Sequence, residues 1–148
     1  MEDVVLILNV VASWTMVGVI WFVQVVHYPL LSVIPVESAT TVAVEHQRRT
    51  GWVVMIPMAV EGVTTLLLLG MVPDGVAWFV PWLAGLPLVA ALGGTVFLSV
   101  PRHARMANNP DASVGRELVS TNWVRTIGWS LRAAVSTGML LATLAVRA

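Results

Sequence analysis

Four long apolar stretches fill most of this chain, and each of them carries a few polar residues at helical spacing. A helix that crosses the hydrocarbon core of a membrane needs about 20 predominantly apolar residues, and each stretch is long enough. The stretches predict one all-α domain over residues 1–148, a four-helix transmembrane bundle. The predicted spans cover about residues 4–28, 50–71, 77–100 and 122–146.

Composition supports a membrane protein and excludes several classes of site. Hydrophobic residues make up 57% of the chain and charged residues 11%, whereas a soluble domain averages about 25% charged residues. The formal net charge is zero, so charge predicts no attraction to nucleic acid. The chain has no cysteine, which excludes disulfides, thiolate metal sites and thiol catalysis. The expected partners are the lipid bilayer and a hydrophobic small molecule, and homo-oligomerisation is left open.

The distribution of charge predicts how the bundle sits in the membrane. Two acidic residues follow Met1, where a cleavable signal would be basic, so the first stretch is expected to remain as a span. The loops after the first and third spans are rich in arginine, and the opposite ends are mostly acidic. The arginines are Arg48, Arg49, Arg102, Arg105 and Arg116, and the acidic residues are Glu2, Asp3 and Asp74. The positive-inside rule predicts a multi-pass protein of the cell inner membrane, with cytoplasmic long loops and both termini on the non-cytoplasmic side.

The connections between the spans carry turn signals. Pro73-Asp74-Gly75 predicts a tight turn, and Asn108-Asn109-Pro110-Asp111 predicts another. Residues 36–49 are expected to form an amphipathic extension of the second helix, and residues 113–117 to start a short interfacial helix.

The polar residues of each predicted span fall on or near one helical face. A polar group that faced lipid would lack a hydrogen-bond partner, so these faces are predicted to meet inside the bundle. The residues are Asn9, Ser13, Gln24 and His27 in the first span, Glu61 in the second, Thr95, Ser99 and His103 in the third, and Asn122, Arg125, Trp129, Arg132 and Ser136 in the fourth.

Glu61 and Arg132 stand out because both charges lie deep in their spans, at matching depths of about 15 Å at the rise of an α-helix. A central charge costs about 2.5–3.5 kcal/mol on insertion scales, so the two residues are predicted to pair. The pair is interpreted either as a structural ion pair that fixes helix register or as a catalytic pair. In the catalytic alternative Glu61 is a general base, and the nearby positive charge of Arg132 adjusts its pKa. Snorkelling of Arg132 and protonation of Glu61 are the remaining alternatives.

The three histidines lie at the same side of the predicted spans: His27 ends the first, His46 precedes the second and His103 ends the third. Three helices can therefore bring three imidazoles together, and imidazole ligates copper, iron, zinc and nickel. One hypothesis is a metal site, with Cu, non-haem Fe or haem as the cofactor. The alternatives are interfacial histidines that bind loops and lipid headgroups, and acid–base chemistry without metal, since histidine titrates near neutral pH.

Four further residues are candidates for binding a substrate. Asn122 and Arg125 share a stripe on the fourth span, where they can orient a carbonyl group or stabilise developing negative charge. Trp129 lies deeper on this stripe and is expected either to line a pocket for a flat apolar ligand or merely to pack. Gln24, on the polar face of the first span, completes the set.

Two segments of the second half resemble those of small four-helix membrane proteins related to the anthrone oxygenases. They are Val100-Pro101-Arg102-His103-Ala104-Arg105-Met106 and Thr121-Asn122-Trp123-Val124-Arg125-Thr126. The first half, through His27-Tyr28-Pro29, His46, Arg49, Pro57 and Glu61, resembles related bacterial membrane proteins of unknown function. His103 stands where members of the family often carry Asn. The resemblance implies oxidation or oxygenation of an apolar aromatic substrate.

The favoured hypothesis is a membrane-embedded, oxygenase-like redox enzyme that acts on a hydrophobic aromatic or quinone-like molecule entering from the lipid. One rival is a module that binds or transports a small molecule, protons or ions, because charges inside a membrane also mark such paths. Another is a non-catalytic membrane subunit, in which the polar column only holds the helices together.

Overall fold

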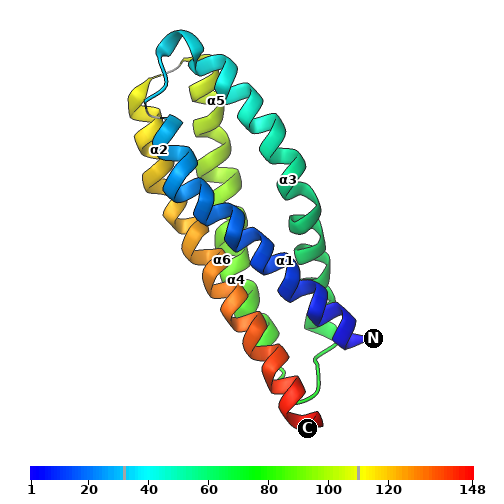
Figure 1. The fold of residues 1–148 in the computed structure, drawn as a ribbon. Coiled ribbons are helices and arrows are strands. Elements are labelled where there is room, and N and C mark those ends of the chain that lie inside the picture. The colour runs from blue at the N-terminus through cyan, green and yellow to red at the C-terminus, as the bar shows by residue number, and fades with distance from the viewer. Residues whose placement is uncertain (32, 110) are drawn as a thin grey trace.

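The computed structural model describes residues 1–31, 33–109 and 111–148, and over these residues it contains helices and turns but no strand. The elements are α1 (Glu2–Phe22), η1 (Val23–His27), α2 (Tyr28–Leu31), α3 (Val36–Gly70), α4 (Val80–Gly93), η2 (Gly94–Ser99), α5 (Val100–Asn108) and α6 (Ala112–Arg147), where η marks a π-helix. Figure 1 shows them arranged as a long, narrow bundle. Because α1, η1 and α2 follow one another without a break, as do α4, η2 and α5, the elements make four long helices.

Each of the four long helices can cross a membrane. They cover Glu2–Leu31, Val36–Gly70, Val80–Asn108 and Ser113–Arg147, and each is long and apolar enough to span the hydrocarbon core. The prediction of an all-α, four-helix transmembrane bundle is confirmed, and the chain is a multi-pass membrane protein. The predicted helical extension over residues 36–49 is also present, because α3 begins at Val36.

The structure differs from the sequence prediction at two helix ends. Residues 113–117 form the first turns of α6 instead of a separate helix, and α4 begins at Val80 instead of near residue 77. α6 starts early because the Asp111 side chain accepts a hydrogen bond of 2.9 Å from the backbone nitrogen of Ser113. This bond holds the pKa of Asp111 below its ordinary value. Of the turn predicted over residues 108–111, Pro110 lies outside the described residues.

Both chain termini lie at one end of the bundle, which we call the terminal end (Figure 1). The predicted turn between α3 and α4 is also there, and Gly75 adopts a φ of 75°, a left-handed conformation without steric cost for glycine. Arg147 forms an ion pair with Asp3 and a second one, of 3.5 Å, with Asp74. The two other connections lie at the opposite end, which we call the loop end.

Apolar side chains fill the interior along the bundle and also cover its outer surface. Buried groups comprise Leu6, Leu68 and Met139 near the terminal end, Met16, Ile20 and Trp129 in the middle, and Leu31 and Leu118 near the loop end. On the outside, Leu66 is 71% and Phe97 is 76% exposed. Such a surface would cost about 25 cal/mol per Å² in water, so it is suited to contact with lipid.

Two π-helical segments interrupt the first and third spans near the loop end. η1 ends two residues before Pro29, and η2 ends two residues before Pro101. A proline has no amide hydrogen and its ring crowds the carbonyl four residues earlier, which lies inside η1 or η2. A π turn takes up an extra residue, so the side chains that follow it are rotated about the helix axis. Tyr28 and His103, which follow the two segments, are both buried.

Gly128 of α6 lies directly against α4. A β-carbon added there would lie 2.9 Å from the carbonyl oxygen of Pro87 and 3.1 Å from Cβ of Ala91. We expect Gly128→Ala to lower the free energy of unfolding by about 1–3 kcal/mol, because overpacking pushes the helices apart. Gly138→Ala, on the same helix with no atom within 4 Å of the added carbon, is the control and should keep the parent stability or raise it by up to about 1 kcal/mol, because alanine favours a helix over glycine. Thermal unfolding in detergent measures both, and equal stabilities would contradict the close contact between α4 and α6.

Candidate functional site

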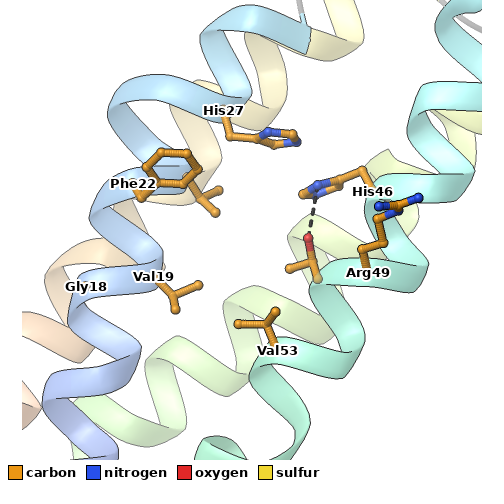
Figure 2. A pocket seen from close by; sticks show the side chains of 9 residues that line it. Gly18, Val19, Phe22, His27, His46, Arg49 and Val53 are labelled. Atoms are coloured by element: carbon orange, nitrogen blue, oxygen red, sulfur yellow. Dashed lines mark hydrogen bonds between the residues drawn. The ribbon is translucent and has the colours of Figure 1, made fainter.

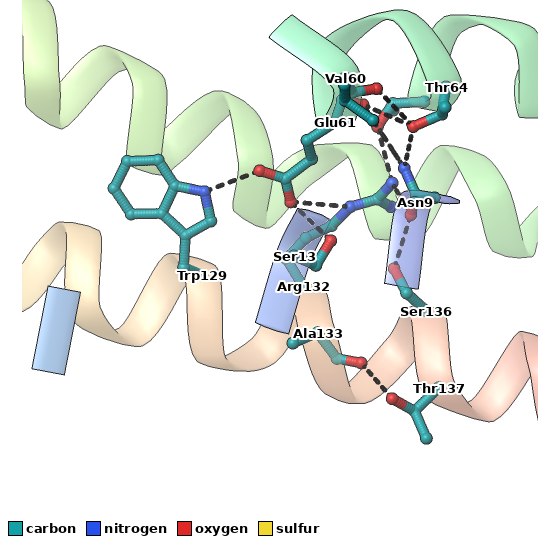
Figure 3. Close-up of polar contacts among 11 residues, drawn as sticks. Asn9, Ser13, Val60, Glu61, Thr64, Trp129, Arg132, Ala133, Ser136 and Thr137 are labelled. Carbon is teal, nitrogen blue, oxygen red and sulfur yellow. Dashed lines mark hydrogen bonds and ion pairs between the residues drawn. The ribbon is translucent and has the colours of Figure 1, made fainter. Parts of the chain in front are cut away.

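Glu61 and Arg132 meet in the middle of the bundle, as predicted. Nε of Arg132 lies 3.7 Å from Oε1 of Glu61, and both side chains are almost fully buried. Ser13 donates a hydrogen bond of 2.7 Å to Oε1, and Trp129 donates one of 2.9 Å to Oε2. Figure 3 shows the carboxylate between the indole of Trp129 and the guanidinium of Arg132. Both carboxylate oxygens therefore have partners inside the protein.

Neutral oxygen atoms hold the guanidinium of Arg132 on its other side. Its Nη2 donates to Oδ1 of Asn9 at 2.8 Å and to the hydroxyl of Thr65 at 2.7 Å. Asn9 in turn donates to the Thr64 hydroxyl at 2.8 Å and accepts from Ser136 at 3.0 Å. These contacts join α1, α3 and α6. The Glu61 cluster, as we call it, comprises Asn9, Ser13, Glu61, Thr64, Thr65, Trp129, Arg132 and Ser136.

Glu61 and Arg132 are closed to ligands in this structure. Neither residue lines any of five cavities in the described part of the chain, and of their partners Thr65 lies on the wall of an apolar groove between α3 and α4. A buried ion pair offsets the loss of hydration only when further hydrogen bonds satisfy its polar atoms. Both carboxylate oxygens and Nη2 of Arg132 have such bonds, whereas Nε and Nη1 of Arg132 have no hydrogen-bond partner among the described residues. Because none of these cavities reaches the pair, the geometry favours the structural alternative, and the catalytic roles of both residues stay a prediction.

The three histidines come together near the loop end. His27 of η1 and His46 of α3 stack with ring centroids 4.1 Å apart, and the His46 centroid lies 5.0 Å from that of His103 in α5. Figure 2 shows His27 and His46 reaching toward each other across the space between their helices. The ring centroid of Tyr28 lies 5.4 Å from that of His103. We call His27, Tyr28, His46 and His103 the imidazole cluster.

The orientation of these rings does not form a metal site. A metal ion bound by imidazole lies close to the plane of the ring. The rings of His27 and His46 are stacked with only 22° between their planes, so their nitrogen atoms cannot both bind one ion. Within residues 1–31, 33–109 and 111–148, no group of three or more His, Asp or Glu side chains could hold a metal ion. Ligation of copper or iron would need other rotamers and stays a prediction, as does ligation of haem.

Tyr28 connects the imidazole cluster to Arg125. Its hydroxyl lies 2.8 Å from Nε2 of His103 and accepts a hydrogen bond of 3.2 Å from Nη1 of Arg125. The same nitrogen donates to the Ser99 hydroxyl at 3.1 Å and to Oδ1 of Asn122 at 3.0 Å. Sequence analysis missed Tyr28 as a site residue, although the chain has a single tyrosine and it directly follows a candidate histidine.

Hydrogen-bond chemistry indicates where the protons around Tyr28 lie. Arginine has donors only, so the Tyr28 oxygen accepts from Arg125 and its own hydrogen is free for Nε2 of His103. Neutral His103 then carries its proton on Nδ1. That Nδ1 has no hydrogen-bond partner among the described residues, and neither has Nε2 of His27. The imidazole cluster therefore holds hydrogen-bonding groups that a ligand can satisfy.

The other predicted substrate-binding residues bind one another. Asn122 donates a hydrogen bond of 2.8 Å to Oε1 of Gln24, and Gln24 donates one of 3.1 Å to the backbone carbonyl of Val119. Trp129 is fully buried, and the guanidinium carbon of Arg125 lies 5.4 Å from the centroid of its ring. Of the four candidates, Arg125 alone lines one of the described cavities. Asn122 and Trp129 contact Arg125, and Gln24 contacts Asn122.

Two cavities adjoin at His46. The first, of about 230 Å³, has Tyr28, His46, Ser99, His103 and Arg125 among the residues of its wall, and we call it the inner cavity. The second, of about 480 Å³, lies between α1 and α3 and has His27 and His46 on its wall, and we call it the lateral cavity. Pockets for small molecules commonly measure about 300–1,000 Å³, so the two together offer room for a ligand.

Removing one member of the Glu61–Arg132 pair should destabilise the protein strongly, because the other charge stays buried without its counter-charge. We expect Glu61→Gln and Arg132→Gln each to cost about 3–5 kcal/mol of unfolding free energy, and the double variant to cost clearly less than the sum. Arg147→Gln, which breaks the exposed pair with Asp3, is the control and should leave stability nearly unchanged. Unfolding in mixed detergent measures all four variants, and strictly additive losses would contradict the pairing.

Comparison with known proteins finds no relative of this chain. No protein-family model, no curated protein and no solved structure matches it. The resemblance to relatives of the anthrone oxygenases therefore stays a prediction. Function has to be inferred from the chemistry of the imidazole cluster, Arg125 and the two cavities.

Proposed function

We propose that this chain is a membrane-embedded, oxygenase-like enzyme that removes a proton from a hydrophobic aromatic or quinone-like molecule and so prepares it for oxidation. The observation that carries the proposal is the hydrogen-bonded series Arg125–Tyr28–His103 on the wall of the inner cavity. This series combines a base, a hydroxyl and a permanent positive charge beside a space that can hold part of a ligand.

In this proposal the imidazole cluster supplies the base. His46 and His103 both line the inner cavity, and a neutral imidazole has one nitrogen with a lone pair that can accept a proton. Proton removal leaves negative charge on the substrate oxygen or on the conjugated ring. Arg125 keeps its charge and stabilises this anion directly or through the Tyr28 hydroxyl. The anion loses electrons to dioxygen more readily than the neutral molecule does.

The distribution of arginine supports an orientation for this enzyme. Arginines cluster toward the loop end, whereas at the terminal end Arg147 stands among acidic residues. The loop-end residues are Arg48, Arg49, Arg102, Arg105 and Arg116. By the positive-inside rule, we place the protein in a bacterial inner membrane with the loop end in the cytoplasm and both termini outside. The inner cavity then lies near the cytoplasmic interface.

Turnover of anthrone by the purified protein in lipid nanodiscs tests the proposal. Anthrone and one dioxygen give anthraquinone and one water, so an oxygen electrode and absorbance follow the same reaction. We expect His103→Gln to lower kcat by about 100-fold, because the general base is lost.

Arg147→Gln, at the terminal end, is the activity control and should keep the parent rate. An unchanged kcat in His103→Gln, or no turnover by the parent protein, would contradict the enzyme. Binding of anthraquinone without turnover would favour a binding module instead.

Metal analysis of the same preparations checks the metal hypothesis: stoichiometric copper or iron that is lost in His27→Ala would assign the histidines to a metal site.

A further inference from the structure

The lateral cavity has apolar walls and a mouth on the outer surface. Val19, Phe22 and Val53 line it, and Phe22 and Val53 are 59% and 58% exposed. Figure 2 shows Val19 and Val53 on opposite sides of the space, with His27 and His46 at its far end. Because the surrounding surface contacts lipid, a molecule dissolved in the bilayer reaches this mouth without crossing water.

At its polar end the lateral cavity offers a ligand the hydrogen-bonding groups of imidazole rings and not a charged side chain in its interior. Nε2 of His27 has no hydrogen-bond partner among the described residues. Arg49, which also lines the cavity, is paired with Glu45 at 3.0 Å, and the same carboxylate also binds Arg48 at 2.8 Å. Because the Arg49 side chain is 73% exposed, its charge lies mostly outside the cavity. A neutral carbonyl or hydroxyl oxygen fits His27 better than a carboxylate or a phosphate, which would need a cation inside the cavity.

His46 and Thr50 separate the lateral cavity from the inner cavity, because both residues line both spaces. Nδ1 of His46 lies 3.0 Å from the Thr50 hydroxyl, a contact within one turn of α3. Rotation of the His46 side chain about its own Cα–Cβ bond would break this hydrogen bond and the ring contacts with His27 and His103, and would join the cavities while the helices stay in place.

We propose that the lateral cavity is the lipid-side binding site for a flat, apolar molecule with a neutral carbonyl or hydroxyl oxygen, and that His46 is the gate to the inner cavity. The ring system of the molecule lies among Val19, Phe22 and Val53, and its oxygen binds His27. What happens to the molecule beyond the gate rests on the proposed function, but the binding site is testable without turnover.

Photolabelling in nanodiscs with 2-azidoanthraquinone tests the site. Mass spectrometry should find the label on residues of the lateral cavity, above all Phe22 and Val53. Gly18 also lines this cavity, and a β-carbon added there meets no atom within 4 Å, so Gly18→Leu, checked for parent-like thermal unfolding, is the variant that fills the space. We expect Gly18→Leu to lower this labelling by about tenfold, equivalent to about 1.4 kcal/mol of binding free energy.

Gly62→Leu is the matched control. Gly62 has equally open surroundings but lines an apolar groove between α3 and α4, so its substitution should leave the labelling unchanged. Equal labelling of the parent and Gly18→Leu would overturn the binding site, and the proposed function would survive if anthrone were still oxidised. Labelling that Gly18→Leu abolishes in a protein without turnover would uphold the site and overturn the enzyme.

The gate has its own test in His46→Ala. Ser99 lines the inner cavity and is buried, and opening the gate should let the label reach it, whereas the parent protein should show little label there. A label distribution that is the same in His46→Ala and in the parent protein would overturn the role of His46 as a gate.

Discussion

The ion pair between Glu61 and Arg132 constrains the whole bundle, because two opposite charges deep in a membrane have to meet at one depth. Their pairing sets the register of α3 against α6, and the hydrogen bonds from Ser13 and to Asn9 bring α1 to the same level. The hydrocarbon core of a membrane holds no water that could form hydrogen bonds with these groups. Few other rotations of the helices about their axes would therefore keep the groups hydrogen-bonded. The position of Trp129 follows from its bond to Glu61, and Arg125 rests on the face of Trp129. The position of Arg125 near the loop end therefore depends on the contacts of Glu61 and Trp129 in the middle of the bundle.

Sequence reasoning predicted the four spans, their inward polar faces and the Glu61–Arg132 contact, because hydropathy and helical periodicity are local properties. It did not predict the interior position of Tyr28, since a regular α-helix has no π segment and η1 changes the face that the following residues present. Pro29 and Pro101 were the available signals, because each stands shortly after one of the two π segments. Nor did spacing predict that His27 and His46 would stack, or that Gln24 and Asn122 would bind each other, because ring orientation and partner choice depend on packing between helices.

The lateral cavity follows from the way α3 divides its contacts. At the loop end the small side chains of Ala39 and Ala43 let α3 pack closely against Met106 of α5 and Val114 of α6. α3 therefore follows α5 there, while α2 continues along α6, and α1 and α3 diverge toward the loop end (Figure 1). Nearer the terminal end Asn9 and Ser13 bind α3 directly, and the cavity that remains between α1 and α3 there is smaller, at about 320 Å³. The larger opening between these two helices therefore lies toward the loop end.

Trp129 has a consequence for how protons travel through this protein. Its indole nitrogen donates to Glu61, while its ring faces Arg125. An indole N–H gives a hydrogen bond but has no lone pair with which to receive one, so no relay can pass this residue from the imidazole cluster to the carboxylate. Trp129 therefore blocks proton transfer between the imidazole cluster and the Glu61 cluster, although the charges of the two clusters still interact. If the histidines exchange protons as in the proposed function, those protons do not reach Glu61 through Trp129, and this residue gives no proton path along the bundle.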